Sequence, residues 1–306
     1  MNQGETKRPS QNKKVPRISG KKRLAVLGTV AVIAVLLTAW IAWGNTALEV
    51  SEFMVSSEKL PKNFSGYRIA QISDLHNAQF GEENTQLLEL LESAEPDCIV
   101  LTGDLVDSRR TDVEVALSFA EQAVGIAPVY YVNGNHEARI GEYEDLKAGL
   151  EKAGVTVLEN QAVPLERSGQ KIYLTGVNDP SFQTDLPFDE PEEVLRGELD
   201  QVTPEKDGYW ILLSHRPEYF DLYREYGVDL VFAGHAHGGQ FRLPFVGGVA
   251  APGQGLFPKY DDGLYTESGT SMLVSRGLGN SLFPFRVNNR PEILVAELKS
   301  AEHERA

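Results

Sequence analysis

A chain of 306 residues and 33.8 kDa has room for one large domain or two small ones. Its 42% hydrophobic and 24% charged residues are typical of a globular protein and exclude a disordered or fibrous chain. A formal net charge of -15 argues against nucleic acid as a partner, and a single cysteine excludes both an intrachain disulfide framework and a cysteine-rich zinc module.

The amino-terminal segment separates into a basic stretch and an apolar one. Residues 1–23 hold eight Lys and Arg and one acid, a net charge of +7 that leaves -22 on the remaining 283 residues. Residues 24–43 then carry no charge for 20 residues, which makes about 30 Å of helix and matches the core of a bilayer. Trp40 and Trp43 lie at the far end, where aromatic side chains favour the membrane interface. We predict a basic cytoplasmic tail over 1–23 and a transmembrane anchor over 24–43.

The charges that flank the apolar segment predict its orientation. Eight basic residues precede it, whereas only Lys59 and Lys62 lie in the 20 residues that follow. The positive-inside rule therefore predicts a single-pass protein of the cell membrane with a cytoplasmic amino terminus and an extracytoplasmic acidic domain. Two alternatives stay open: a cleaved signal peptide, whose apolar region is usually only about 7–15 residues long, and a domain that faces the cytoplasm.

Beyond an expected linker at 44–64, short apolar runs alternate with helical periodicities. Several runs are almost continuously apolar, as expected for strands buried on both faces. The predicted strands are 67–72, 98–101, 129–132, 172–177, 209–213, 229–232, 272–275 and 293–296. Apolar residues at helical spacing predict helices around 87–91, 113–120 and 146–150. This alternation of strands and helices predicts an α/β layered fold.

Polar clusters follow the predicted strands, and five of the six histidines belong to them or lie beside them. The clusters are Asp74-Leu75-His76, Gly103-Asp104, Gly134-Asn135-His136-Glu137, Ser214-His215 and Gly234-His235-Ala236-His237. Side chains that follow the strands of an α/β sheet converge on the crevice where such folds bind their substrates. Seven side chains are therefore candidate metal ligands: Asp74, His76, Asp104, Asn135, His215, His235 and His237.

The chemistry of this donor set favours a catalytic centre. Oxygen and imidazole donors without sulfur are typical of catalytic rather than structural metal sites. Seven ligands are too many for one tetrahedral ion and suit two ions that share a carboxylate. The donors fit two divalent metal ions, with Mn, Fe or Zn expected and Mg an option for the oxygen ligands.

The order of these motifs resembles the calcineurin-like metallophosphoesterase superfamily over residues 65–298. Residues 238–240, 275–279 and 290–292 further resemble a bacterial membrane-associated or exported branch of it. The resemblance implies a four-layer α/β/β/α metallophosphoesterase sandwich, preceded here by one N-terminal transmembrane helix. It sets the catalytic domain at 65–298 and leaves 299–306 as a polar tail.

The resemblance also implies a role for each candidate residue. Asp104 would bridge two ions, of which the first is held by Asp74, His76 and His237 and the second by Asn135, His215 and His235. His136 would not bind metal but would contact the scissile phosphate and assist the leaving oxygen. Glu137 stands where the family often has Asp, which predicts a different orientation of the His136 ring.

The predicted function is that of a dinuclear-metal phosphoester hydrolase. A metal-bridging hydroxide attacks phosphorus in line, and His136 assists the leaving group. The expected substrates are a phosphodiester, a phosphomonoester or a lipid-linked pyrophosphate at the membrane, so the partners are a phosphorylated small molecule or lipid and the bilayer itself. The alternative is a non-catalytic, membrane-tethered metal-binding or scaffold protein. The sequence carries no signal for an oligomeric state.

Overall fold

The computed structural model describes residues 20–183, 191–204 and 208–301. The chain divides into two compact units, residues 1–42 and 43–306. Helix α1 (Gly20–Thr46) is the one helix among the described residues that is long and apolar enough to cross a membrane, and its apolar span buries nothing. A core helix would be buried, so this exposure favours an anchor or a signal sequence. Most of the expected basic tail, residues 1–19, lies outside the described residues.

Two six-stranded mixed sheets form the second unit. The first runs in the order β1 (Glu49–Ser57), β16 (Glu292–Ser300), β2 (Tyr67–Ile72), β3 (Cys98–Thr102), β4 (Val129–Val132) and β5 (Thr156–Val157). The second runs β14 (Gly263–Glu267), β15 (Thr270–Val274), β9 (Leu230–Ala233), β8 (Trp210–Leu213), β7 (Gln170–Gly176) and β6 (Gln161–Arg167). Strands β2 to β5 are parallel to one another, and so are β7, β8, β9 and β15.

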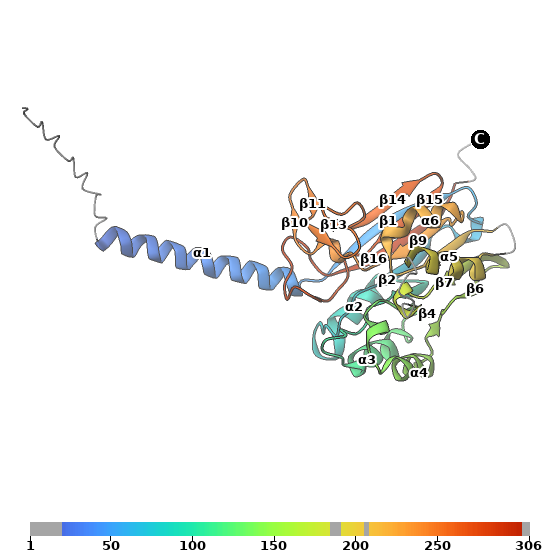
Figure 1. Ribbon diagram of the computed structural model, residues 1–306, viewed down its shortest axis with the longest axis horizontal. Helices are drawn as coiled ribbons and strands as arrows, with labels where there is room; N and C mark the ends of the chain where they lie inside the picture. The colour runs from blue at the N-terminus through green and yellow to red at the C-terminus, as the bar shows by residue number, and fades with distance from the viewer. Residues whose placement is uncertain (1–19, 184–190, 205–207, 302–306) are drawn as a thin grey trace, which may run out of the picture. The chain divides into compact units, whose positions relative to one another are not determined.

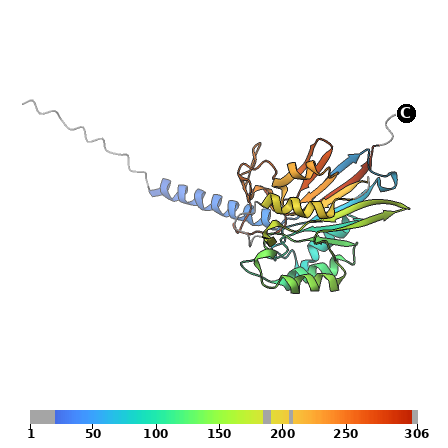
Figure 2. The same ribbon diagram turned by 45° about the vertical axis from the view of Figure 1, so that its right-hand side comes forward.

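Helices cover the outer faces of both sheets. Figures 1 and 2 show α2 (Thr85–Ser93), α3 (Val113–Ala123) and α4 (Tyr143–Ala153) on one side, and α5 (Pro191–Val202) and α6 (Phe220–Glu225) on the other. Single 3-10 turns occur at Lys62–Phe64, Glu82–Asn84, Glu137–Arg139, Pro180–Gln183, Pro217–Tyr219 and His237–Gly239. Four short strands follow the last of these: β10 (Arg242–Leu243), β11 (Gly247–Gly248), β12 (Ala250–Ala251) and β13 (Gly255–Leu256).

Successive side chains of the central strands pack into two different hydrophobic cores, one on each face of the sheet. In β3, Cys98 and Val100 pack between the two sheets, whereas Ile99 and Leu101 pack beneath the helices. In β8, Ile211 belongs to the core between the sheets, where it packs with residues of both. Since successive side chains of a strand point to opposite faces, a continuous apolar run is what two-sided burial requires. The predicted four-layer α/β/β/α sandwich is confirmed.

The predicted linker at 44–64 is wrong for nine of its residues. Strand β1 pairs in parallel with β16, from Glu49 opposite Glu292 to Ser57 opposite Ser300. Its inward side chains Phe53 and Val55 join the core between the sheets, while the alternate residues face solvent. An edge strand needs only this half-apolar pattern, which resembles a polar linker. Strand β16 also extends two residues into the expected tail, and residues 302–306 lie outside the described residues.

Candidate metal centre

The candidate ligands stand just beyond the carboxyl ends of β2, β3, β4, β8 and β9. Five of them have a left-handed backbone with φ between 46 and 64°: Asp74, His76, Asp104, His235 and His237. This conformation costs a non-glycine residue about 1–3 kcal/mol, and it persists where the surroundings determine it strongly. Such strain, repeated at one edge of the fold, is characteristic of a functional site.

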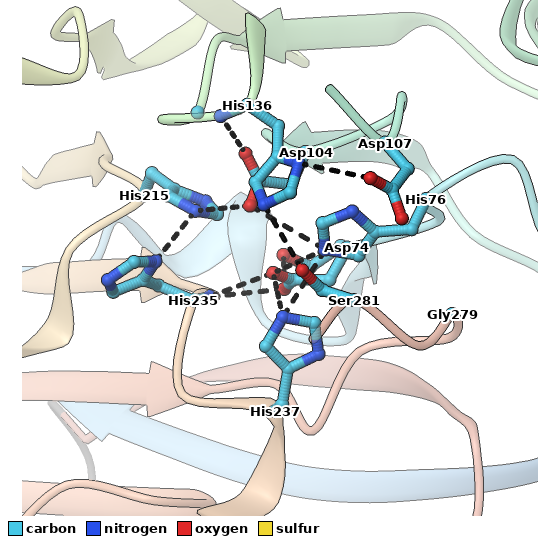
Figure 3. A network of polar contacts seen from close by, with 12 residues as sticks. Asp74, His76, Asp104, Asp107, His136, His215, His235, His237, Gly279 and Ser281 are labelled. Atoms are coloured by element: carbon cyan, nitrogen blue, oxygen red, sulfur yellow. Dashed lines mark hydrogen bonds and ion pairs between the residues drawn. The ribbon is translucent and has the colours of Figure 1, made fainter. Parts of the chain in front are cut away.

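The first group of donors comprises Asp74, His76, Asp104 and His237, all of them buried. The Nε2 atom of His76 lies 3.3 Å from Nε2 of His237 and 3.6 Å from Oδ2 of Asp104. The Nε2 atom of His237 lies 3.4 Å from Oδ1 of Asp74. Figure 3 shows these four side chains pointing toward one another from the loops after β2, β3 and β9. Their donor atoms all lie within 4.8 Å of one another, which is the spacing of ligands around one ion.

The second group shares Asp104 with the first and adds His215 and His235. Oδ2 of Asp104 lies 3.2 Å from Nε2 of His215, which lies 3.1 Å from Nδ1 of His235. The other ring nitrogen of His215, Nδ1, is 2.7 Å from the carbonyl oxygen of Thr102 and donates to it. This hydrogen bond holds the ring with Nε2 facing the site, a common device behind metal-binding histidines.

The pKa values of the buried histidines in the two groups favour the binding of a metal cation. Burial lowers the pKa of His76 to about 4 and holds the pKa values of His235 and His237 well below the usual range, so these rings are neutral. Burial opposes charge at His215 too, but Asp104 beside it raises the pKa of His215 to about 10. The buried carboxylates thus draw positive charge to this position, and neutral imidazole is the form that binds metal.

The side chain of Asn135 shows whether the residues of this site suit a bound metal ion. Its side chain lines the same pocket as Asp104 and His136, and its buried Oδ1 has no hydrogen-bond partner among the described residues. A buried amide oxygen without a donor costs about 1–3 kcal/mol. A divalent ion would satisfy this oxygen, so the residues present fit two metal ions that share Asp104.

His136 is held differently from the candidate ligands. The backbone N–H of Ser108 donates to Nδ1 of His136 over 2.9 Å, and Oδ1 of Asp107 lies 3.8 Å from the same nitrogen. Because Nδ1 accepts a hydrogen bond, the neutral ring carries its proton on Nε2, which lies 3.2 Å from Oγ of Ser281. Burial lowers the pKa of His136, which keeps the ring neutral. The site therefore presents one imidazole N–H donor beside the two groups.

Glu137 holds the loops together instead of contacting the His136 ring. Its buried carboxylate accepts backbone N–H bonds of 2.8 Å from Asp104, 3.2 Å from Val106 and 2.7 Å from Gly134. The sequence predicted that Glu137 would change the orientation of His136. In the structure the ring is oriented by Ser108, which no motif indicated, and Glu137 joins the loops after β3 and β4.

A pocket of about 720 Å³ opens beside the two groups and has a cationic wall. Arg109, Arg139 and Arg216 line it together with Asp104, Asn135 and His136. Arg216 is fixed by two bonds to Asp179, of 2.5 and 2.9 Å. Apolar residues also line the pocket: Ala250, Ala251, Pro252, Leu282 and Phe283. Guanidinium groups attract phosphate, so this pocket suits an anion with an apolar substituent.

The family model for the calcineurin-like phosphoesterases matches residues 67–239, more than half of the chain. The chain belongs to the calcineurin-like phosphoesterase family. This phosphoesterase is 31% identical over 261 residues to the uncharacterized metallophosphoesterase YkuE of Bacillus subtilis, over 83% of this chain and 86% of that one. It is 28% identical over 253 residues to phosphodiesterase YaeI of Escherichia coli, over 77% and 83% of the two chains.

A third relative is named as a transmembrane protein. The transmembrane protein with metallophosphoesterase domain of Danio rerio is 28% identical over 300 residues, which cover 92% of this chain and 64% of that one. The resemblance to the calcineurin-like metallophosphoesterase superfamily is thus confirmed, and so is the class of the enzyme, a metal-dependent phosphoesterase.

Gly234 lies between β9 and the candidate ligand His235, where the loop after β9 comes very close to the loop after β2. A Cβ atom at Gly234 would lie 1.9 Å from Oγ of Ser73 and 2.6 Å from Oδ2 of Asp74. Gly234→Ala is therefore expected to displace Asp74 and weaken metal binding about 10–100-fold, the usual cost of disturbing the support of a ligand. Metal titration of the purified protein measures this effect. Gly197→Ala, where a Cβ meets nothing within 4 Å, is the matched control; equal affinities in both variants would contradict the close approach.

Proposed function

We propose that this phosphoesterase hydrolyses phosphodiesters with two metal ions, at the extracytoplasmic face of the membrane that anchors it. Asp74, His76 and His237 would hold one ion, and Asn135, His215 and His235 the other. The observation that carries the proposal is the position of Asp104, whose carboxylate belongs to both groups of donors. One carboxylate shared by two groups is the arrangement that a bridged pair of ions requires.

The residues around the two groups support a hydrolytic step. When bound, two divalent ions supply charge to the phosphate oxygens and lower the pKa of a water so that it can attack phosphorus. The Nε2–H of His136 would donate to the leaving oxygen, because the Ser108 N–H bond keeps the proton on that nitrogen. Arg109 and Arg139, which line the same pocket, would offset the repulsion between a phosphate and an acidic domain.

The membrane location has independent support from the sequence and from α1. The 20 uncharged residues of 24–43 are longer than the apolar region of a signal peptide, which favours an uncleaved anchor, and the basic tail before them favours an orientation with the carboxyl side outside. A relative named as a transmembrane protein is consistent with an anchor. Protease access to the domain in intact cells tests this orientation, since a protected domain would contradict it.

The test of the activity compares a diester with a monoester on the full-length protein in detergent. We expect a chelator to abolish the hydrolysis of bis-p-nitrophenyl phosphate and added Mn²⁺ to restore it, with slower turnover of p-nitrophenyl phosphate. The name of the Escherichia coli relative supports the preference for a diester. Protein that binds two metal ions per chain but hydrolyses neither ester would favour the scaffold alternative.

A further inference from the structure

Exposed apolar side chains gather around the mouth of the pocket. We call residues 241–257 and 281–285 the apolar rim. Ten large apolar residues of the described chain after Trp43 are exposed, and eight of them belong to the rim. The eight are Leu243, Phe245, Val246, Leu256, Phe257, Leu282, Phe283 and Phe285. Such a concentration marks an interaction surface, because exposed apolar residues are normally scattered.

The two segments of the rim form one surface. The ring of Phe241 lies 5.3 Å from that of Phe283 and 5.5 Å from that of Phe285. Nε2 of Gln240 donates to the carbonyl oxygen of Phe285 over 2.7 Å. Figure 1 shows β10, β11 and β13 of this surface grouped apart from the two large sheets. Leu282 and Phe283 also line the 720 Å³ pocket, so the apolar surface begins at the entrance of the site.

The rim differs from the rest of the molecule in charge. Residues 241–257 and 281–285 contain no Asp or Glu and one basic residue, Arg242, in a chain with 44 acids and a net charge of -15. This arginine is paired with Asp261 over 2.9 Å and with Asp262 over 2.8 Å. An apolar surface that carries no acidic residue can enter an anionic bilayer without the repulsion that the rest of this acidic domain would meet.

The end of α1 and the residue after it are bonded to Arg286 and Arg290, which follow residues 281–285 in the chain. The side chain of Asn45 accepts the N–H of Arg286 over 2.8 Å and donates to the carbonyl oxygen of Arg286 over 3.1 Å. The guanidinium of Arg290 donates to the carbonyl oxygen of Ala47 over 2.8 Å and lies 5.1 Å from the ring of Trp43. Trp43, the last residue of the uncharged run, thus lies beside Arg290, so the proposed anchor would leave the bilayer close to the segment that follows residues 281–285.

We infer that the apolar rim inserts into the lipid bilayer that holds the N-terminal anchor, so that the pocket opens onto lipid headgroups. The inference rests on the proposed anchor and on the proposed diesterase activity. It names the substrate class of the site: a phosphodiester carried by a lipid, with phosphorus at the metal groups and the apolar part along Leu282 and Phe283. Ser281, which contacts His136, joins this surface directly to the reacting groups.

The first test measures membrane depth and needs no activity. The full-length protein carries Cys98→Ala and one new cysteine, either Phe245→Cys or Leu256→Cys. We label this cysteine with a polarity-sensitive dye and place the protein in vesicles of phosphatidylcholine and phosphatidylglycerol. We expect severalfold quenching by lipids with a doxyl group near the headgroup. Lys171→Cys, exposed at the opposite, amino end of β7, is the control and should stay unquenched. Equal quenching of the dye at all three positions would overturn the inference. A dye at residue 245 or 256 that is shielded from water but not quenched by the lipids would also overturn it, because shielding without quenching indicates a contact between copies of the protein.

The second test separates this inference from the proposed function. Methyl p-nitrophenyl phosphate in solution and hexadecyl p-nitrophenyl phosphate in vesicles carry the same reacting group. The double variant Phe245→Ser/Leu256→Ser, outside the pocket lining, is expected to lose at least tenfold in turnover of the hexadecyl ester and to change less than twofold on the methyl ester. Equal turnover of the hexadecyl ester by variant and native protein contradicts membrane insertion. Absence of methyl ester hydrolysis by the native protein contradicts the diesterase function instead, and the quenching result then decides the inference alone.

Discussion

Replacing Asp104 with Asn is expected to remove both metal ions and to lower turnover about 10³-fold or more. The carboxylate lies 3.2 Å from Nε2 of His215 and 3.6 Å from Nε2 of His76, so one side chain serves both groups of donors. An amide keeps the size of the side chain but removes the negative charge that would lie between two cations. Metal content per chain, measured by mass spectrometry on the purified protein, and turnover of bis-p-nitrophenyl phosphate check the result.

Asp107→Asn is the matched control for this variant. Asp107 follows Asp104 by three residues and is equally buried, but it belongs to neither group of donors. We expect Asp107→Asn to keep both ions, even if it slows turnover through the contact with His136. An Asp104→Asn protein that still holds two ions would refute the bridging role.

Replacing His136 with Ala is expected to lower turnover about 10²–10⁴-fold while the protein keeps its metal. The reason is the fixed tautomer: the Ser108 N–H bond to Nδ1 leaves Nε2 as the donor that faces the pocket. The loss of a proton donor matters most when the leaving oxygen is strongly basic. Turnover of methyl phenyl phosphate should therefore fall more than turnover of methyl p-nitrophenyl phosphate, and parallel assays of the two esters measure this difference.

Ser281→Ala is the control for the histidine, since it removes only the hydroxyl that lies 3.2 Å from Nε2. It should change turnover far less than His136→Ala and leave the leaving-group dependence intact. If His136→Ala lost its metal, or lost equal activity on both esters, the histidine would have a structural role and not the proposed one.

The central strands of the fold were predictable because their signal is local. Strands β2, β3, β8 and β9 bury both faces, so each forms a short run of apolar residues that identifies it without knowledge of its neighbours. The edge strand β1 has no such run. It is completed by β16, which lies more than 200 residues later in the chain, and only that pairing distinguishes it from a polar linker.

Helix α5 (Pro191–Val202) was missed although its sequence carried a signal. Its buried residues Val194, Leu195, Leu199 and Val202 lie at helical spacing along one face. Between them lie charged residues that weaken the apolar character of the segment, so the run does not stand out by composition. Here the periodicity, and not the hydrophobicity, was the signal to follow.

The sequence by itself determined the fold class, the family and which residues are candidate ligands, because each of these depends on residue types at short spacing beyond apolar strands. Only the tertiary structure decided which side chains meet. It made Asp104 common to two groups of donors, placed Glu137 on three backbone N–H groups, and brought Ser281 to His136 from 145 residues away. It also gathered the apolar rim from two segments around one pocket. The physical reason is that a hydrogen bond or a shared ligand requires atoms within about 3–4 Å, and such proximity between distant segments arises from the packing of two sheets that no local pattern encodes.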